Sequence, residues 1–144
     1  MKHHIDFEKV PHNYAMCLNS TCSQSSTCLR YLAAESAPDY LTEWTIISPK
    51  YLSNKVEGCP QYRSSRKIRY AKGFITLLNN IPLKQSKAVQ QKLMSLLGQR
   101  TYYRCRKGER LLSPDEQSKI EQLLRQCHVA TPLTFDAYVE DYNW

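Results

Sequence analysis

The feature that most limits how this chain can fold is a group of cysteines near its start, at positions 17, 22, 28 and 59. The stretch between the first three is rich in Ser, Thr, Asn and Gln, which favour turns over regular secondary structure. A structural zinc site needs four thiolate or imidazole ligands on short, flexible segments that can fold around the ion. The fourth cysteine lies in a Gly-Cys-Pro turn, which suits a returning ligand. We therefore expect one zinc ion to be bound by Cys17, Cys22, Cys28 and Cys59.

The spacing of these cysteines leaves other interpretations open. Zinc knuckles usually place about two to four residues between paired cysteines, whereas four and five residues separate the first three here. Iron–sulfur clusters are also held by four cysteines, with more varied spacing. Free cysteines can instead be small apolar core residues, and we expect this of Cys105 and Cys127. His12 could replace one cysteine as a ligand, but an exposed histidine in an irregular arm is the simpler interpretation.

The N-terminal residues include acids and no apolar run, so they do not have the pattern of a secretion signal. No apolar stretch approaches the roughly 20 residues needed to cross a bilayer. We therefore expect a cytoplasmic protein with no membrane partner. In that compartment thiols stay reduced, so cysteines are more often metal ligands or core residues than disulfides.

The size and composition of the chain predict one small α+β domain spanning residues 1–144. With 144 residues, 42% of them hydrophobic and 23% charged, the chain can bury a core of its own. Residues 1–14 are expected to form an irregular arm, residues 15–60 the cysteine-cluster region, and residues 61–144 a core of strands and helices. The fold class is therefore α+β, with a short N-terminal Cys-rich loop and helix, a few-stranded sheet and two main helices in the C-terminal half.

Local patterns place the elements of this fold. Residues 43–48 and 66–71 have the composition or alternation of strands. A short helix should begin near Cys28, with Ser26 or Thr27 as its N-cap. Residues 102–110 fit either a strand and turn or a short helix, and the tail over 135–144 has helix-like spacing.

Two helices in the second half have the clearest signals. Residues 86–97 show apolar residues at helical spacing and are followed by Gly98, which suits a helix end. Ser113-Pro114-Asp115-Glu116 has the sequence of a capping box with proline at the first helical position. We expect these helices to form much of the core.

Positive charge is concentrated in the middle of the chain, where residues 48–110 hold fifteen Lys and Arg against two acids. Two basic stretches within it contain interleaved tyrosines, a composition that suits phosphate contacts and base stacking. A nucleic-acid-binding protein is therefore an alternative function, and an acidic protein is another class of partner. The candidate contact residues are Arg63, Arg66, Lys67, Arg69, Arg100, Arg104, Arg106, Lys107 and Arg110.

No catalytic motif is present in the sequence. Phosphate-binding glycine loops, G-x-S-x-G and H-E-x-x-H are all missing, and the chain has only four glycines and four histidines. A cysteine nucleophile would lack an evident histidine partner. We therefore expect a non-catalytic binding or regulatory protein rather than an enzyme, with an iron–sulfur redox or sensor protein as a further alternative.

Motifs along most of the chain resemble one family of small uncharacterised cysteine-motif proteins from gut Bacteroidetes. The matching residues are Tyr14-Ala15-Met16-Cys17, Cys22, Cys28-Leu29-Arg30, Cys59-Pro60, Tyr102-Tyr103-Arg104, Gly108, Ser113-Pro114-Asp115-Glu116-Gln117, Phe135-Asp136, Tyr142 and Trp144. The family pattern has proline after the second cysteine, where this chain has Ser23. The resemblance implies a shared four-cysteine feature and a single domain, and it supplies no catalytic residue.

Overall fold

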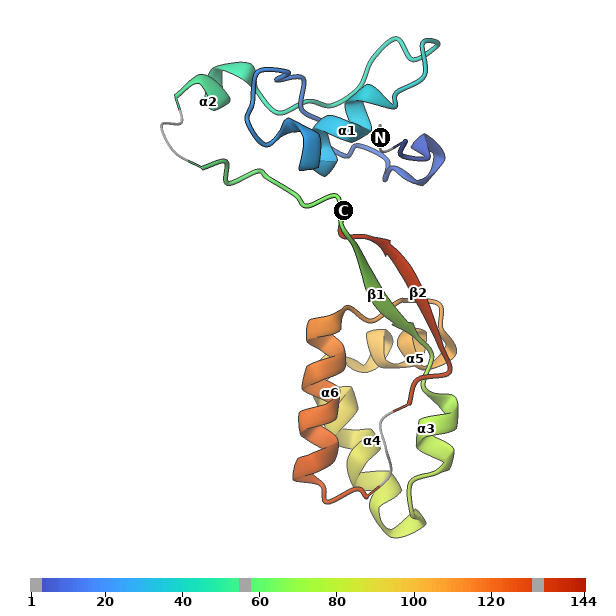
Figure 1. Ribbon diagram of the computed structural model, residues 1–144. Coiled ribbons are helices and arrows are strands. Elements are labelled where there is room, and N and C mark those ends of the chain that lie inside the picture. Colours follow the sequence, from blue (N-terminus) through green and yellow to red (C-terminus); the bar gives the residue numbers. More distant parts are fainter. Residues whose placement is uncertain (1–3, 55–57, 131–133) are drawn as a thin grey trace. The chain divides into compact units, whose positions relative to one another are not determined.

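The computed structural model describes residues 4–54, 58–130 and 134–144, and the chain divides into two compact units (Figure 1). Unit 1 contains the residues up to Lys67 together with Tyr142–Trp144, and unit 2 contains Ile68–Asp141. Helices and one two-stranded sheet confirm the expected α+β class. The expected single-domain organisation stays a prediction. Of the helices in the described ranges, none is both long and apolar enough to span a membrane.

Unit 1 consists of short elements around a small core. It contains two 3-10 turns, η1 (Phe7–Lys9) and η2 (Ser25–Thr27), and two short helices, α1 (Leu29–Glu35) and α2 (Pro49–Ser53). Its buried apolar residues in the described ranges are Ile5, Met16, Cys28, Leu29 and Ala33. Most of this unit is therefore held by turns and backbone hydrogen bonds rather than by packing.

The structure corrects two expectations in this unit. Residues 43–48 do not form a strand; they contribute only a parallel bridge between Met16 and Ile46. Trp44 and Ile46 are 40% and 37% exposed, so their β-forming tendency finds little to pack against. Helix α1 forms as expected, but its N-cap is Cys28, because the residues expected to cap it lie inside η2.

Unit 2 is mainly helical and has the larger core. Its helices are α3 (Ile75–Asn79), α4 (Leu83–Leu97), α5 (Gln99–Lys107) and α6 (Pro114–Gln126). The expected helix over 86–97 is confirmed and begins earlier, and residues 102–107 belong to a helix rather than a strand. The twelve buried members of the core are Ala71, Phe74, Leu77, Ile81, Val89, Leu93, Tyr102, Cys105, Leu112, Ile120, Leu124 and Phe135.

The sheet pairs β1 (Lys67–Lys72) with β2 (Ala137–Tyr142), so the expected strand over 66–71 is confirmed. The tail was expected to be helical, and this was wrong, because residues 137–142 form β2. The Asp136 N–H donates to the Gly73 carbonyl oxygen (2.9 Å) just beyond the strand ends. Four of the six β2 residues are exposed. The spacing of apolar residues in this tail therefore does not mark a buried face, and it cannot distinguish a helix from a strand.

A carboxylate from the end of the chain caps helix α3. The backbone N–H groups of Ile75 and Thr76 donate to the two Asp136 carboxylate oxygens, at 2.9 and 3.0 Å. Burial raises the pKa of Asp136, but these hydrogen bonds lower it more, so the net shift is downward. Gly73 has φ +78°, and a Cβ built there would lie 2.6 Å from the nearer Asp136 oxygen. The connection between β1 and α3 therefore requires glycine at this position, both for its backbone conformation and for space.

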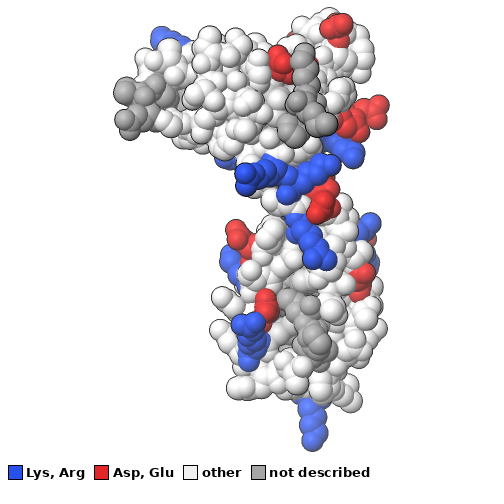
Figure 2. Space-filling view, in the orientation of Figure 1, with Lys and Arg blue, Asp and Glu red and all other residues white. Residues whose placement is uncertain are grey.

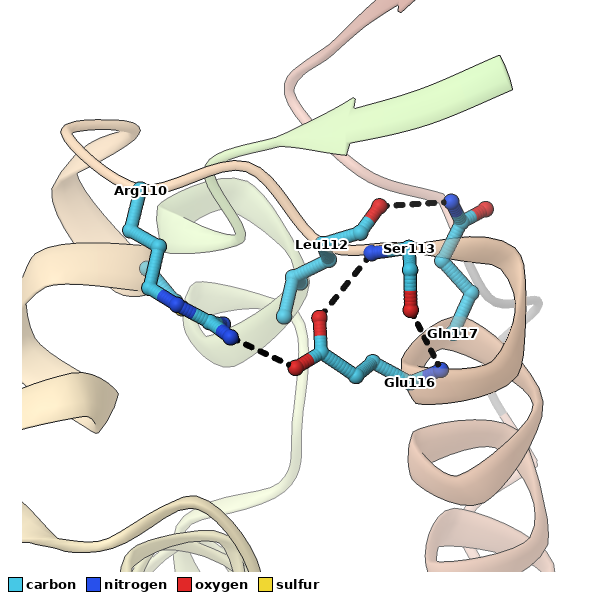
Figure 3. Close-up of polar contacts among 6 residues, drawn as sticks. Arg110, Leu112, Ser113, Glu116 and Gln117 are labelled. Atoms are coloured by element: carbon cyan, nitrogen blue, oxygen red, sulfur yellow. Dashed lines mark hydrogen bonds and ion pairs between the residues drawn. The ribbon is translucent and has the colours of Figure 1, made fainter. Parts of the chain in front are cut away.

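The capping box at the start of α6 forms as expected (Figure 3). The Ser113 N–H donates to one Glu116 carboxylate oxygen (2.9 Å), and the Glu116 N–H donates to the Ser113 hydroxyl (3.3 Å). Arg110 donates to the other Glu116 oxygen at 2.8 Å, and Gln117 donates to the Leu112 carbonyl at 3.0 Å. Burial raises the pKa of Glu116, but the hydrogen bonds from Arg110 and Ser113 lower it below its ordinary value overall.

Glu116→Gln is expected to reduce the free energy of unfolding of unit 2 by about 1 kcal/mol at neutral pH, because it weakens the capping box and the ion pair. The pKa of Glu116 is lowered in the folded state, so its contribution is present above the unfolded pKa of about 4.3 and is lost as the pH falls through the folded value. The difference from wild type should therefore shrink below about pH 4. Urea unfolding followed by far-UV circular dichroism at both pH values measures this.

The matched control for this prediction is Glu121→Gln in the same helix. Glu121 forms an exposed i,i+4 pair with Arg125 and no capping bond, and such pairs contribute about 0.3–0.5 kcal/mol. An equal loss of stability in the two variants would contradict the assignment.

Candidate cysteine site

The four cysteines expected to bind metal line one cavity of unit 1. The cavity has a volume of about 180 Å³, and its wall includes Cys17, Cys22, Cys28 and Cys59. Cys28 is buried and the other three are half-buried. The structure therefore gathers cysteines that are far apart in sequence around the same space.

Backbone hydrogen bonds fix the positions of the cysteine-bearing segments. The Cys17 N–H donates to the Arg30 carbonyl at 3.1 Å, which ties the first cysteine to helix α1. The Cys22 carbonyl accepts from the Ser25 N–H at 3.1 Å, and the Cys59 carbonyl accepts from the Tyr62 N–H at 3.0 Å. The cysteines at 22 and 59 thus each begin a tight turn.

The thiols do not converge on one point. In the described parts of the chain, no group of three or more Cys, His, Asp or Glu side chains is arranged to hold a metal ion. All six cysteines are free thiols. Binding of zinc, with Zn–S distances of about 2.3 Å, would require the four sulfur atoms to come closer together than they lie here.

Arg30 is a component of this site that the sequence reasoning missed. Arg30 lines the cavity, and its guanidinium donates to the Ala15 carbonyl (2.6 Å) and to the Gln61 carbonyl (2.9 Å). It also lies over the Tyr14 ring, 4.7 Å from the centroid. Arg30 therefore joins the segments that precede Cys17 and follow Cys59 to the helix that follows Cys28. Its place two residues after a candidate ligand is the signal that could have pointed to it.

The remaining candidate ligands lie elsewhere. Cys105 is fully buried in the core of unit 2, and Cys127 packs against that core, as expected for structural cysteines. The Arg110 guanidinium donates to the Cys105 sulfur at 3.4 Å. His12 is exposed and lines a different cavity, so it does not contribute to the cysteine site.

The nine candidate nucleic-acid contacts fall in both units. Arg63, Arg66 and Lys67 are exposed residues of unit 1. On the face drawn in Figure 2, Lys and Arg side chains lie over the β1–β2 ribbon, with Asp and Glu side chains among them. The Arg69 guanidinium lies over the Tyr138 ring, 3.8 Å from its centroid.

Helix α5 contributes the other candidate contacts. Arg100, Arg104 and Lys107 are exposed on one face of α5, and Tyr103 lies between them. Arg106 is half-buried and Arg110 is paired with Glu116, so these two residues present less free charge.

One protein-family model matches the chain, over residues 1–144, and its description is "Family of unknown function (DUF6078)". No curated protein and no solved structure matches the chain.

Proposed function

Since the chain belongs to DUF6078, a family of unknown function, over residues 1–144, we propose that it is a non-catalytic binding protein whose unit 1 is organised by one structural zinc ion. The ligands are Cys17, Cys22, Cys28 and Cys59. The observation that carries this proposal is that all four line one cavity. A reducing compartment, the cytoplasm, belongs to the same proposal, because zinc ligation requires thiolates rather than disulfides.

The small core of unit 1 is a reason to expect that a metal ion stabilises its fold. Unit 1 has roughly 70 residues but only five buried apolar residues in the described ranges, against twelve in the core cluster of unit 2. A core of this kind rarely supplies enough free energy, and small natural domains compensate with metals or disulfides. Bound zinc would add its binding free energy directly to the stability of the folded unit.

The surroundings of the cavity suit four thiolates. Zinc with four thiolates has a net charge of −2, and burying uncompensated charge is costly. Arg30 lines the cavity and would supply one compensating positive charge.

Metal analysis combined with a thiol count tests the proposal on untagged protein purified without oxygen. We expect about one zinc per chain. A chelator should expose the thiols of Cys17, Cys22, Cys28 and Cys59, whereas the buried Cys105 thiol should stay protected with or without metal. Folded protein with no metal and fully reactive thiols on unit 1 would overturn it. If the protein instead contains iron and inorganic sulfide and absorbs in the visible range, the four cysteines hold the alternative iron–sulfur cluster rather than zinc.

A further inference from the structure

Another cavity of unit 1, the basic groove, is lined by cations, hydroxyls and tyrosines and, among the described residues, by no carboxylate. Its volume is about 770 Å³. The cations are Arg66 and Lys67, and the rings are Tyr62 and Tyr142. Thr27 and two serines supply the remaining lining groups. Cations and hydroxyls donate hydrogen bonds to phosphate oxygens, and tyrosine rings stack on bases.

The wall of the basic groove is held in place by its own hydrogen bonds. The Leu29 N–H donates to the Arg63 carbonyl at 2.7 Å, and the Ser65 N–H donates to the Thr27 carbonyl at 3.0 Å. The Tyr62 hydroxyl donates to the Thr27 side chain at 3.1 Å. The segment that bears Tyr62 and Arg66 is therefore paired with the segment that bears Cys28.

The far side of the groove comes from the end of the chain. The Lys67 ammonium lies over the Tyr142 ring, 5.4 Å from its centroid. The Tyr142 ring contacts Trp144 at a centroid distance of 5.5 Å, and Trp144 contacts Tyr14 at 5.2 Å. These edge contacts orient the Tyr142 ring, over which the Lys67 ammonium lies.

We propose that the basic groove of unit 1 binds single-stranded nucleic acid, with Arg66 and Lys67 contacting phosphates and Tyr62 stacking on a base. The combination of cations with tyrosine rings favours a single strand, because a duplex covers the faces of its bases. An acidic protein would use the cations but gain nothing from stacking. The inference rests on the proposed zinc site only insofar as zinc keeps unit 1 folded.

Fluorescence anisotropy with a labelled oligothymidylate of about 12 nucleotides tests the proposal. Arg66→Gln/Lys67→Gln is expected to weaken binding about tenfold or more. It should also make the negative slope of log K against log salt shallower by about 1.4, because two phosphate contacts are lost. The matched control is Arg104→Gln/Lys107→Gln on α5, which removes the same charge from unit 2 and should change affinity less than about threefold. Equal losses in the two double variants would overturn the proposal, as would absence of binding by wild type.

The ring is tested separately from the charge. Tyr62→Leu should weaken binding about fivefold or more, whereas Tyr62→Phe should keep most of the affinity because the ring remains. An unlabelled duplex or polyglutamate that competes as well as the single strand would overturn the assignment of ligand. Zinc content and tryptophan emission of each variant show whether unit 1 is intact. Nucleic-acid binding by a folded, metal-free protein would leave this proposal standing while the zinc proposal fails.

Discussion

Cys22→Ser is expected to unfold unit 1 and to abolish zinc binding, while unit 2 stays folded. Apparent binding free energies of structural zinc in small peptides are about 10–16 kcal/mol, so weakening the ion's hold costs more than the small core of unit 1 can offset. Both tryptophans, Trp44 and Trp144, lie in unit 1. Their emission should therefore shift to longer wavelength, while the far-UV circular dichroism of α4, α5 and α6 is largely retained.

The matched control for this experiment is Cys127→Ser. Cys127 is half-buried against the core of unit 2 and does not line the cysteine cavity. The Cys127→Ser variant should bind zinc normally, and the free energy of unfolding of its unit 2 should fall by about 1 kcal/mol. Small, equal effects of the two substitutions would contradict the zinc proposal. Cys22 would then contribute no more to stability than Cys127, which binds no metal in this proposal.

Gly73→Ala is expected to destabilise unit 2 by about 2–4 kcal/mol. The φ of +78° disfavours any residue with a Cβ, and that Cβ would lie 2.6 Å from an Asp136 carboxylate oxygen. Relieving the clash moves the carboxylate away from the N–H groups of Ile75 and Thr76, so helix α3 also loses its cap. Urea unfolding followed by far-UV circular dichroism measures the loss.

Gly108→Ala separates the clash from the backbone strain. Gly108 also has positive φ, +83°, but a Cβ built there would meet only the flexible Lys72 side chain at close range, at 3.1 Å. It should cost only about 1 kcal/mol. If the two variants were equally destabilised, the Asp136 contact would be without energetic consequence.

Elements whose signals are local could be predicted from the sequence. The capping box at Ser113 and Glu116 forms because both partners lie within four residues, and helix α4 ends where Gly98 follows it. Propensity alone misled the interpretation of residues 43–48, which have β-forming side chains but only one bridge. The tail was misassigned because β2 depends on pairing with β1, a contact between residues about 70 positions apart that no local pattern records.

The candidate site shows the same division. Residue type was enough to select Cys17, Cys22, Cys28 and Cys59 as a set, and the structure places all four around one cavity. Arg30 was not selected, because its role depends on carbonyl groups about fifteen residues before it and thirty after it. The basic residues were selected as one group, but they belong to two units. Only the structure shows that some of them line a groove with tyrosines, whereas others lie on the surface of helix α5.

The Asp136 cap and strand β2 have a consequence for synthesis on the ribosome. Helix α3 receives its cap from a residue 60 positions later, β1 pairs with residues 137–142, and unit 1 includes Tyr142–Trp144. Neither unit can therefore reach its final form until residues 135–144 have been translated and have left the exit tunnel. Until then β1 lacks this partner, and an unpaired strand edge is a hazard for association with other nascent chains. The final contacts of both units therefore depend on the same ten residues.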